Sequence, residues 1–207
     1  MSEKTRIVVF VSGGGTNLQA IIDSEKSGKL KSGEIVGVIS SSPTAYAIER
    51  AGKAGIPCAV VSLKECRDRT EFEEKILENT EKYGAELIVL AGFMSILSPG
   101  FINRYRDRII NVHPSLIPSF CGKGYYGLNV HKAALEYGVK VTGATVHYVN
   151  EIPDGGKIID QKSVRVSPGE TPESLQQKVM KKCEWIILPR ACEKISARIA
   201  KAKKGKK

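Results

Sequence analysis

An amide, an imidazole and a carboxylate occur in this sequence where one reacting carbonyl group could contact all three. Asn111 and His113 end an apolar run, residues 108–113, that is typical of a strand. Side chains two residues apart on a strand point to the same face of a sheet, so both should face one space. Asp154 comes later, in an Asp-Gly-Gly turn whose glycines allow tight bending. The alternative is a strand end with a hydrogen-bonded histidine and an unrelated turn.

This trio favours acyl-type chemistry. A carboxylate near an imidazole raises the pKa of the histidine and favours the imidazolium. That cation can donate a proton or stabilise an oxyanion, while the Asn111 amide donates a hydrogen bond to the same oxygen. Ser115 lies inside a proline-bounded loop, and no serine or cysteine is clearly placed as a nucleophile. We therefore expect direct transfer of a group between two bound substrates.

A glycine-rich turn at residues 12–17 includes Gly15, Thr16 and Asn17 and precedes an expected helix. Main-chain amides there can approach an anion, and the start of the helix adds partial positive charge. The turn lacks the lysine of a Walker loop, and Leu18 stands where a dinucleotide fingerprint needs its third glycine. The pattern favours a phosphate or phosphosugar over NAD. A turn that needs glycine only for its geometry is the alternative.

Two further segments could contribute to a site. Residues 90–99 follow an expected strand as an apolar loop, which could wall a pocket for a flat aromatic ligand or could pack in the core. Lys181 and Glu184 are three residues apart on an expected helix and so share a face. There they either contact a ligand or form an exposed ion pair.

Composition excludes several classes of protein. The chain has 207 residues and a net charge of +10, of which +6 falls within residues 193–207, where no aromatic side chains are interleaved for base stacking. We therefore expect no nucleic-acid partner, and the remaining excess fits an anionic small substrate. Five scattered cysteines without a C-x-x-C pair indicate reduced thiols and no metal. No membrane span or signal peptide is apparent, so we expect a cytoplasmic protein. We expect it to be a monomer or a homodimer.

Strand-like and helix-like runs alternate through most of the chain, which predicts a doubly wound α/β sheet. Continuous apolar runs, typical of buried parallel strands, occur at 7–11, 34–39, 58–61, 87–90 and 109–112. Amphipathic stretches lie at 16–26, 45–54, 68–83 and 129–137. Alternating patterns at 140–148 and 157–165 suit an antiparallel addition, and a long terminal helix should begin after Thr171. We expect one domain over residues 1–200 and a disordered basic tail over 201–207.

Four segments together resemble the phosphoribosylglycinamide formyltransferases, the folate-dependent enzymes of purine synthesis. They are residues 12–22, 91–94, 111–118 and 145–156, and the similarity covers nearly the whole chain. The resemblance implies a Rossmann-like sheet, 10-formyltetrahydrofolate as cosubstrate, and direct attack by the glycinamide amine through a tetrahedral intermediate. It implies that Asn111, His113 and Asp154 are catalytic. It implies that the acceptor's phosphoribosyl group contacts Gly15, Thr16, Asn17, Lys181 and Glu184. It implies a folate site made of Arg69, Met94, Ser95, Ile96, Leu97, Asn111, Asn150, Glu151, Ile152, Pro153 and Asp154.

The sequence departs from that family's pattern in three places. Residues 119–129 form a longer loop than the family's usual turn, Ser95 stands where arginine is common, and Lys157 replaces a usual proline. Enzymes that formylate methionyl-tRNA or hydrolyse formyltetrahydrofolate share the Asn, His and Asp residues, but usually carry an additional domain. A non-catalytic protein that binds folate or a phosphosugar is the remaining alternative.

Overall fold

The computed structural model describes residues 4–205 and contains one seven-stranded sheet in the order β3-β2-β1-β4-β5-β6-β7. The first five strands are parallel, whereas β6 pairs antiparallel with β5, and β7 pairs antiparallel with β6. The strands are β1 (Thr5–Val11), β2 (Gly33–Ser40), β3 (Cys58–Val60), β4 (Leu87–Leu90), β5 (Ile109–His113), β6 (Val141–Tyr148) and β7 (Ile158–Arg165). The doubly wound α/β fold with an antiparallel addition is therefore confirmed.

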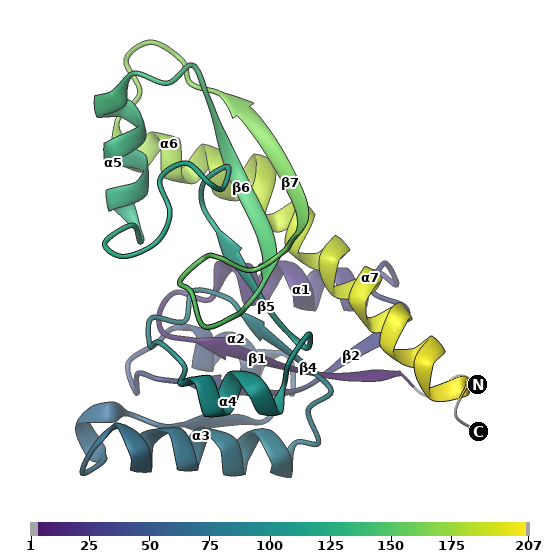
Figure 1. The fold of residues 1–207 in the computed structure, drawn as a ribbon. Helices are drawn as coiled ribbons and strands as arrows, with labels where there is room; N and C mark the ends of the chain where they lie inside the picture. The colour runs from purple at the N-terminus through teal and green to yellow at the C-terminus, as the bar shows by residue number, and fades with distance from the viewer. Residues whose placement is uncertain (1–3, 206–207) are drawn as a thin grey trace.

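Helices cover both faces of the sheet (Figure 1). They are α1 (Thr16–Lys26), α2 (Ala47–Lys53), α3 (Arg69–Lys82), α4 (Pro99–Arg104), α5 (Leu128–Tyr137), α6 (Pro172–Val179) and α7 (Trp185–Lys204), with a short 3-10 turn η1 (Leu63–Glu65). Alternate residues of β1 enter two different cores. Val9 packs with α1, α2 and α7, and Phe10 packs with α3 and α4. Burial on both faces explains why the parallel strands are continuously apolar.

Two elements differ from the sequence expectations. The six-residue helix α4 was not predicted, because it is short and begins within a segment that resembles a loop. Ser98 caps it by accepting a hydrogen bond from the Phe101 amide, and Pro99 occupies its first turn.

The terminal helix is the second difference, since it is interrupted by a π-helical turn, η2 (Met180–Glu184), between α6 and α7. At its other end α7 continues to Lys204, into the segment 201–207 that we expect to be a disordered tail, and residues 206–207 lie outside the described part of the chain. Within residues 4–205, no helix combines the length and apolar character needed to cross a bilayer.

Candidate active site

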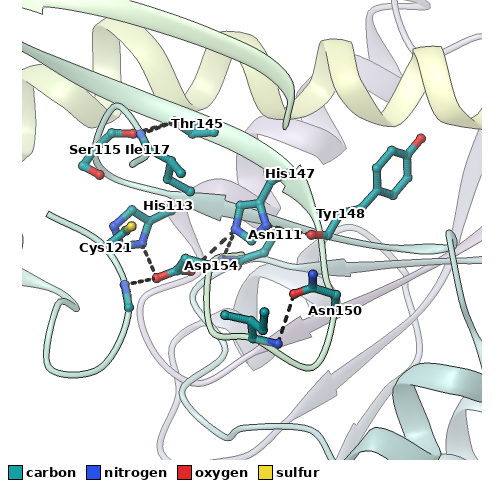
Figure 2. Close-up of polar contacts among 12 residues, drawn as sticks. Asn111, His113, Ser115, Ile117, Cys121, Thr145, His147, Tyr148, Asn150 and Asp154 are labelled. Carbon is teal, nitrogen blue, oxygen red and sulfur yellow. Dashed lines mark hydrogen bonds and ion pairs between the residues drawn. The ribbon is translucent and has the colours of Figure 1, made fainter. Parts of the chain in front are cut away.

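The predicted trio meets where β5 ends beside β6. Asn111 and His113 lie on β5, and Asp154 lies in the loop between β6 and β7. His147, on β6, pairs directly with Asn111 in the register of the two strands. Figure 2 shows Asp154 between the rings of His113 and His147. The spacing argument therefore placed the trio correctly in space, but it did not include His147.

The Asp154 carboxylate has three close polar neighbours. Oδ2 accepts a hydrogen bond from the Gly122 amide at 2.8 Å and lies 3.4 Å from Nδ1 of His113. Oδ1 lies 3.5 Å from Nε2 of His147. Asp154 itself has φ of 55°, a left-handed conformation that aspartate tolerates better than most residues. The loop conformation thus turns this carboxylate toward both imidazoles.

Main-chain carbonyls fix which nitrogen of each imidazole carries a hydrogen. Nε2 of His113 lies 2.9 Å from the carbonyl oxygen of Phe120. Nδ1 of His147 lies 2.8 Å from the carbonyl oxygen of the next residue, Tyr148. A carbonyl only accepts, so these two nitrogens must donate. Nε2 of His147 can then accept from the Asn111 amide, whose nitrogen lies 3.2 Å away. His147 thereby holds the Asn111 amide with its nitrogen toward the cluster.

Burial governs the charge of the pair. His113 is only 4% exposed, and burial lowers its pKa, outweighing the opposite effects of the Phe120 hydrogen bond and the Asp154 charge. Asp154 raises the pKa of His113 as expected, but burial outweighs this effect and the net shift is downward. Burial alone would raise the pKa of Asp154, but its polar contacts with His147 and the Gly122 amide, with the positive charge that a protonated His113 would carry, lower it. At neutral pH the carboxylate is ionised beside a neutral His113.

The loop that follows His113 is fixed by a buried hydroxyl. Oγ1 of Thr145 donates to the Ser115 carbonyl at 2.7 Å and accepts from the Ile117 amide at 3.1 Å. The side-chain amide of Gln161 donates to that same hydroxyl and to the Ile117 carbonyl, each at 3.0 Å. Ser115 donates its own hydroxyl to the Ser119 carbonyl, so it is occupied as a structural donor.

Two residues that the sequence reasoning did not assign lie close to this cluster. Cys121 lies beside the pair (Figure 2), and burial and the negative charge of Asp154 raise the pKa of its thiol. His131, on α5, is fully buried, and neither ring nitrogen has a hydrogen-bond partner among the described residues. Burial, with the charge of His113, lowers the pKa of His131 to about 4. Spacing alone could not find either residue, because both depend on the path of residues 119–129.

The glycine turn lies at the start of α1, as expected. Gly15 has φ of 69°, and a Cβ there would lie 2.7 Å from the Cβ of Ala47, so glycine is required. Two residues further, the side-chain amide of Asn17 donates to Oε2 of Glu184 at 2.7 Å. Burial raises the pKa of Glu184 to about 7, partly offset by the bond from Asn17. Lys181 is exposed while Glu184 is buried, so the expected shared face is wrong.

A cavity of about 790 Å³ extends from Thr16 between α1 and α7. Gln19, Arg50 and Trp185 are among the residues that line it. It therefore opens directly beside the glycine turn.

The expected folate-site residues divide between exposed and buried positions. Met94 and Ile96 are exposed, whereas Leu97 is buried in the core beneath α4. The main-chain amide of Met94 donates to the Ser12 hydroxyl at 2.9 Å. Arg69 donates to the Ile96 carbonyl at 2.8 Å, which fixes the loop after β4.

A second cavity, of about 650 Å³, lies between α3 and α4 and includes Arg69, Ile96 and Leu97 in its lining. None of Asn111, His113 or Asp154 lines either this cavity or the one at Thr16. His113 is buried, whereas Asn111 and Asp154 are partly exposed.

The loop that carries Asp154 is tethered at its start. The Glu151 carboxylate pairs with Arg106 at 2.8 Å, and the Asn150 side chain accepts from the Ile152 amide at 3.1 Å. Ile152 and Pro153 are exposed beside them. Ser95, the remaining residue of the expected folate site, follows Met94 and is half-buried. Among residues 4–205, no group of three or more histidine, cysteine, aspartate or glutamate side chains could hold a metal ion.

The fold and the site together define a Rossmann-like α/β protein with a polar His–Asp–His cluster at the end of a central parallel strand. A model of the family described as formyl transferase matches residues 5–192. The chain belongs to the formyl transferase family.

Its relatives include enzymes and larger multifunctional proteins. The phosphoribosylglycinamide formyltransferase of Escherichia coli (strain K12) is 39% identical over 84% of this chain and 79% of its own length. The trifunctional purine biosynthetic protein adenosine-3 of Gallus gallus is 42% identical over 95% of this chain. The match spans only 19% of that larger protein.

Solved structures of similar proteins share the fold. The glycinamide ribonucleotide transformylase 1 of Symbiobacterium toebii has a TM-score of 0.87 and 38% identity, covering 94% of this chain and 88% of its own. The phosphoribosylglycinamide formyltransferase of Coxiella burnetii, solved in complex with CHES, has a TM-score of 0.85 and 42% identity over the same shares of the two chains. The resemblance inferred from sequence is confirmed.

Proposed function

We propose that this chain transfers the formyl group of 10-formyltetrahydrofolate to the amine of 5'-phosphoribosylglycinamide, a step of purine biosynthesis. The observation that carries the proposal is the half-buried Asp154 carboxylate, held between His113 and His147 beside the Asn111 amide. This cluster offers hydrogen-bond donors for an oxyanion and acceptors for a proton. The names of the relatives supply the acceptor and the formyl group, and the family that the sequence resembles implies the folate donor.

The reaction would proceed by direct attack. The amine nitrogen of the acceptor bonds to the formyl carbon, and the carbonyl electrons move to its oxygen. The Asn111 amide and an N–H of His113 stabilise that oxyanion, and each such donor lowers the barrier by about 3 kcal/mol. The amine releases a proton to the His113–Asp154 pair. The bond from the formyl carbon to N10 of the folate then breaks, and N10 takes up a proton.

The acceptor would bind along the start of α1. Phosphate would contact the main chain at Gly15, Thr16 and Asn17, where the helix has no side-chain cap. Glu184, whose pKa of about 7 leaves it partly protonated at neutral pH, would hydrogen-bond ribose hydroxyls as donor or acceptor. Lys181 is exposed in η2, the turn just before α7, and would contribute positive charge to the acceptor site.

The folate would bind against the loops on either side of the cluster. Met94, Ser95, Ile96 and Leu97 supply one wall, in which Leu97 acts through its main chain because its side chain is buried. Asn150, Glu151, Ile152, Pro153 and Asp154 supply the other wall. Arg69 would reach the carboxylates of the folate tail, although it already donates to the Ile96 carbonyl.

Cys121 raises the question of a covalent route, since it lies near Asp154. Burial and the Asp154 charge raise the pKa of the thiol, which keeps it protonated and weakly nucleophilic. A formyl thioester at Cys121 is therefore disfavoured, and transfer should survive the loss of this thiol.

The deciding experiment offers the purified protein 10-formyltetrahydrofolate with and without 5'-phosphoribosylglycinamide. Formation of the formylated acceptor, with folate turnover that depends on the acceptor, is expected. Turnover that ignores the acceptor would instead identify a hydrolase. Binding of both compounds without turnover would identify a non-catalytic binding protein.

The roles can be tested with a matched set of variants. His113→Ala and Asp154→Asn should abolish transfer with little change in thermal stability. Asp160→Asn is the control. It removes a carboxylate of the outer strand β7, where Asp160 pairs with Arg190 of α7. Near-wild-type rates in His113→Ala or Asp154→Asn would refute the assignment.

A further inference from the structure

Residues 119–127, which we call the strap, make two main-chain hydrogen bonds to the catalytic pair. The Phe120 carbonyl accepts the hydrogen bond from Nε2 of His113 at 2.9 Å. The Gly122 amide donates to Oδ2 of Asp154 at 2.8 Å. His113 is 4% exposed, so the strap and its surroundings shield the ring from solvent. The strap thus contacts both members of the pair.

These contacts use every N–H that a neutral His113 possesses. The single hydrogen of the ring points from Nε2 to the Phe120 carbonyl. The other nitrogen, Nδ1, faces the Asp154 carboxylate at 3.4 Å. A substrate oxygen that needs a donor from His113 must therefore compete with one of these two protein acceptors.

The two acceptors are not equivalent. Asp154 belongs to the catalytic cluster and is held there by the Gly122 amide and by His147. Phe120 contributes only a carbonyl oxygen, which is the same kind of acceptor as a formyl oxygen. The contact with the Phe120 carbonyl is therefore the one that substrate can replace without dismantling the cluster.

We propose that the Phe120 carbonyl is a place-holder for the formyl oxygen, positioning His113 until the strap lifts and substrate takes its place. The inference rests on the proposed function, because it assigns the exchanged oxygen to the formyl donor. Phe120 and Gly122 are in this sense positioning residues, which act through His113 and Asp154.

Aromatic side chains help to hold the strap in place. The Phe120 ring packs edge-on against Tyr125 and Tyr137, with ring centroids 6.3 and 6.0 Å apart. Phe120 has φ of 50°, a conformation that is unfavourable for residues other than glycine and needs support from such contacts. Residues 123–127 are exposed. The three rings of Phe120, Tyr125 and Tyr137, which we call the clasp, thus restrain the middle of the strap, and the Ser115 hydroxyl restrains its start at Ser119.

The clasp offers a variant that cannot disturb the core. Tyr137 lies on α5 and is 81% exposed, so Tyr137→Ala removes a ring from the clasp without opening a buried cavity. Tyr126→Ala is the matched control, since Tyr126 is an exposed tyrosine of the strap that is not one of the clasp rings. Phe120→Ala keeps the main-chain carbonyl but removes the central ring, and gives a second, stronger test.

The experiment measures how fast diethylpyrocarbonate modifies each of the three histidines of the full chain, resolved by peptide mass spectrometry. We expect slow modification of His113 in the wild type. In Tyr137→Ala its rate should rise roughly 3- to 10-fold, the range that loss of one aromatic pair implies. Phe120→Ala should give at least as large a rise, and Tyr126→Ala should match the wild type. His131 and His147 should keep their wild-type rates throughout and serve as internal controls.

Hydrogen exchange supplies a readout that does not depend on chemical labelling. The Gly122 amide should exchange slowly in the wild type, because it donates to Asp154, and faster in Tyr137→Ala and Phe120→Ala. Wild-type rates at His113 and Gly122 in both variants would overturn the proposal. Equal acceleration of all three histidines would also overturn it, because it would indicate general loosening.

Neither measurement requires substrate, so the proposal and the proposed function can fail separately. If the protein transfers no formyl group but shows the expected labelling, the role of the strap stands. The assignment of the exchanged oxygen to the formyl donor is then wrong. If the protein is an active transferase but labelling is unchanged in the clasp variants, the proposed function stands. The place-holder role of the Phe120 carbonyl is then wrong.

Discussion

Replacing Glu184 with glutamine should stabilise this protein above pH 7 and change its stability little near pH 5. Glu184 is 6% exposed, and its Oε2 accepts a hydrogen bond from the Asn17 side-chain amide at 2.7 Å. Burial raises its pKa from an ordinary 4.5 to about 7. Glutamine keeps an oxygen that can accept from Asn17, but it carries no charge at any pH.

The sign follows from the protons bound in each state. Between pH 4.5 and about 7 the folded protein keeps the proton on Glu184, whereas the unfolded chain loses it. The folded state binds more protons in this window, so stability falls as pH rises through it. Above pH 7 the carboxylate is ionised in both states and the loss is complete. The rise in the pKa of Glu184 from 4.5 to about 7 corresponds to a loss of about 3 kcal/mol in the free energy of unfolding. For a domain of this size that is roughly 10 °C in Tm.

Urea unfolding of the wild type and of Glu184→Gln at pH 5 and pH 8 measures this effect. Other groups titrate in the same range, so the informative quantity is the difference between the two proteins at each pH. We expect that difference to grow by about 3 kcal/mol in favour of the variant from pH 5 to pH 8. Glu173→Gln, which removes an exposed carboxylate from α6, should show no such growth. If the difference in the free energy of unfolding between the wild type and Glu184→Gln is the same at both pH values, the inference that the folded protein keeps Glu184 protonated is wrong.

Three further outcomes follow from the site. Asn111→Ala should lower kcat about 10²- to 10³-fold, because it removes one donor to the oxyanion; steady-state assays with both substrates check this, and a smaller loss would move the oxyanion elsewhere. Gly15→Val should raise KM for 5'-phosphoribosylglycinamide, because any Cβ at Gly15 would collide with Ala47, 2.7 Å away; an unchanged KM would place the phosphate elsewhere. Cys121→Ala should leave kcat and KM near their wild-type values, and trapping of a formylated thiol in the wild type by mass spectrometry would contradict direct transfer.

Much of the fold could be predicted because burial leaves a simple pattern. The apolar runs at 7–11 and 87–90 coincide with β1 and β4, which are covered on both faces. The antiparallel addition was predictable from the alternation in β6 and β7. The helix α4 was not, since its six residues are too few to show a helical period.

The π-helical turn explains a second failure of prediction. Residues three apart share a face only when the helix has α geometry, and a π turn places more residues in each turn. Lys181 and Glu184 therefore diverge, and Glu184 points inward to Asn17. Pro189 lies in α7 just beyond the turn and lacks an amide hydrogen to donate to the Trp185 carbonyl. That proline was the only hint of irregularity in the sequence.

The site could be predicted only as far as side-chain types and strand spacing allow. Asn111 and His113 share a face because they are two apart, but their partner His147 depends on the register between β5 and β6. The contacts from Phe120 and Gly122 come from main-chain atoms, whose positions no residue type reveals. The net direction of the His113 pKa also depends on burial, which a motif does not show.

The charges of the pair connect the chemistry to the strap. An α-amine has a pKa of about 8, so the acceptor amine would arrive largely as an ammonium ion and must lose a proton before it attacks. The ionised Asp154 attracts that cation, and Nδ1 of the neutral His113 can take its proton 3.4 Å from the carboxylate. Protonation there would replace two facing acceptors by an ion pair, and would strengthen Nε2 as a donor on the other side of the ring. One proton could thus activate the amine and prepare His113 for the oxyanion, provided that the Phe120 carbonyl has released Nε2.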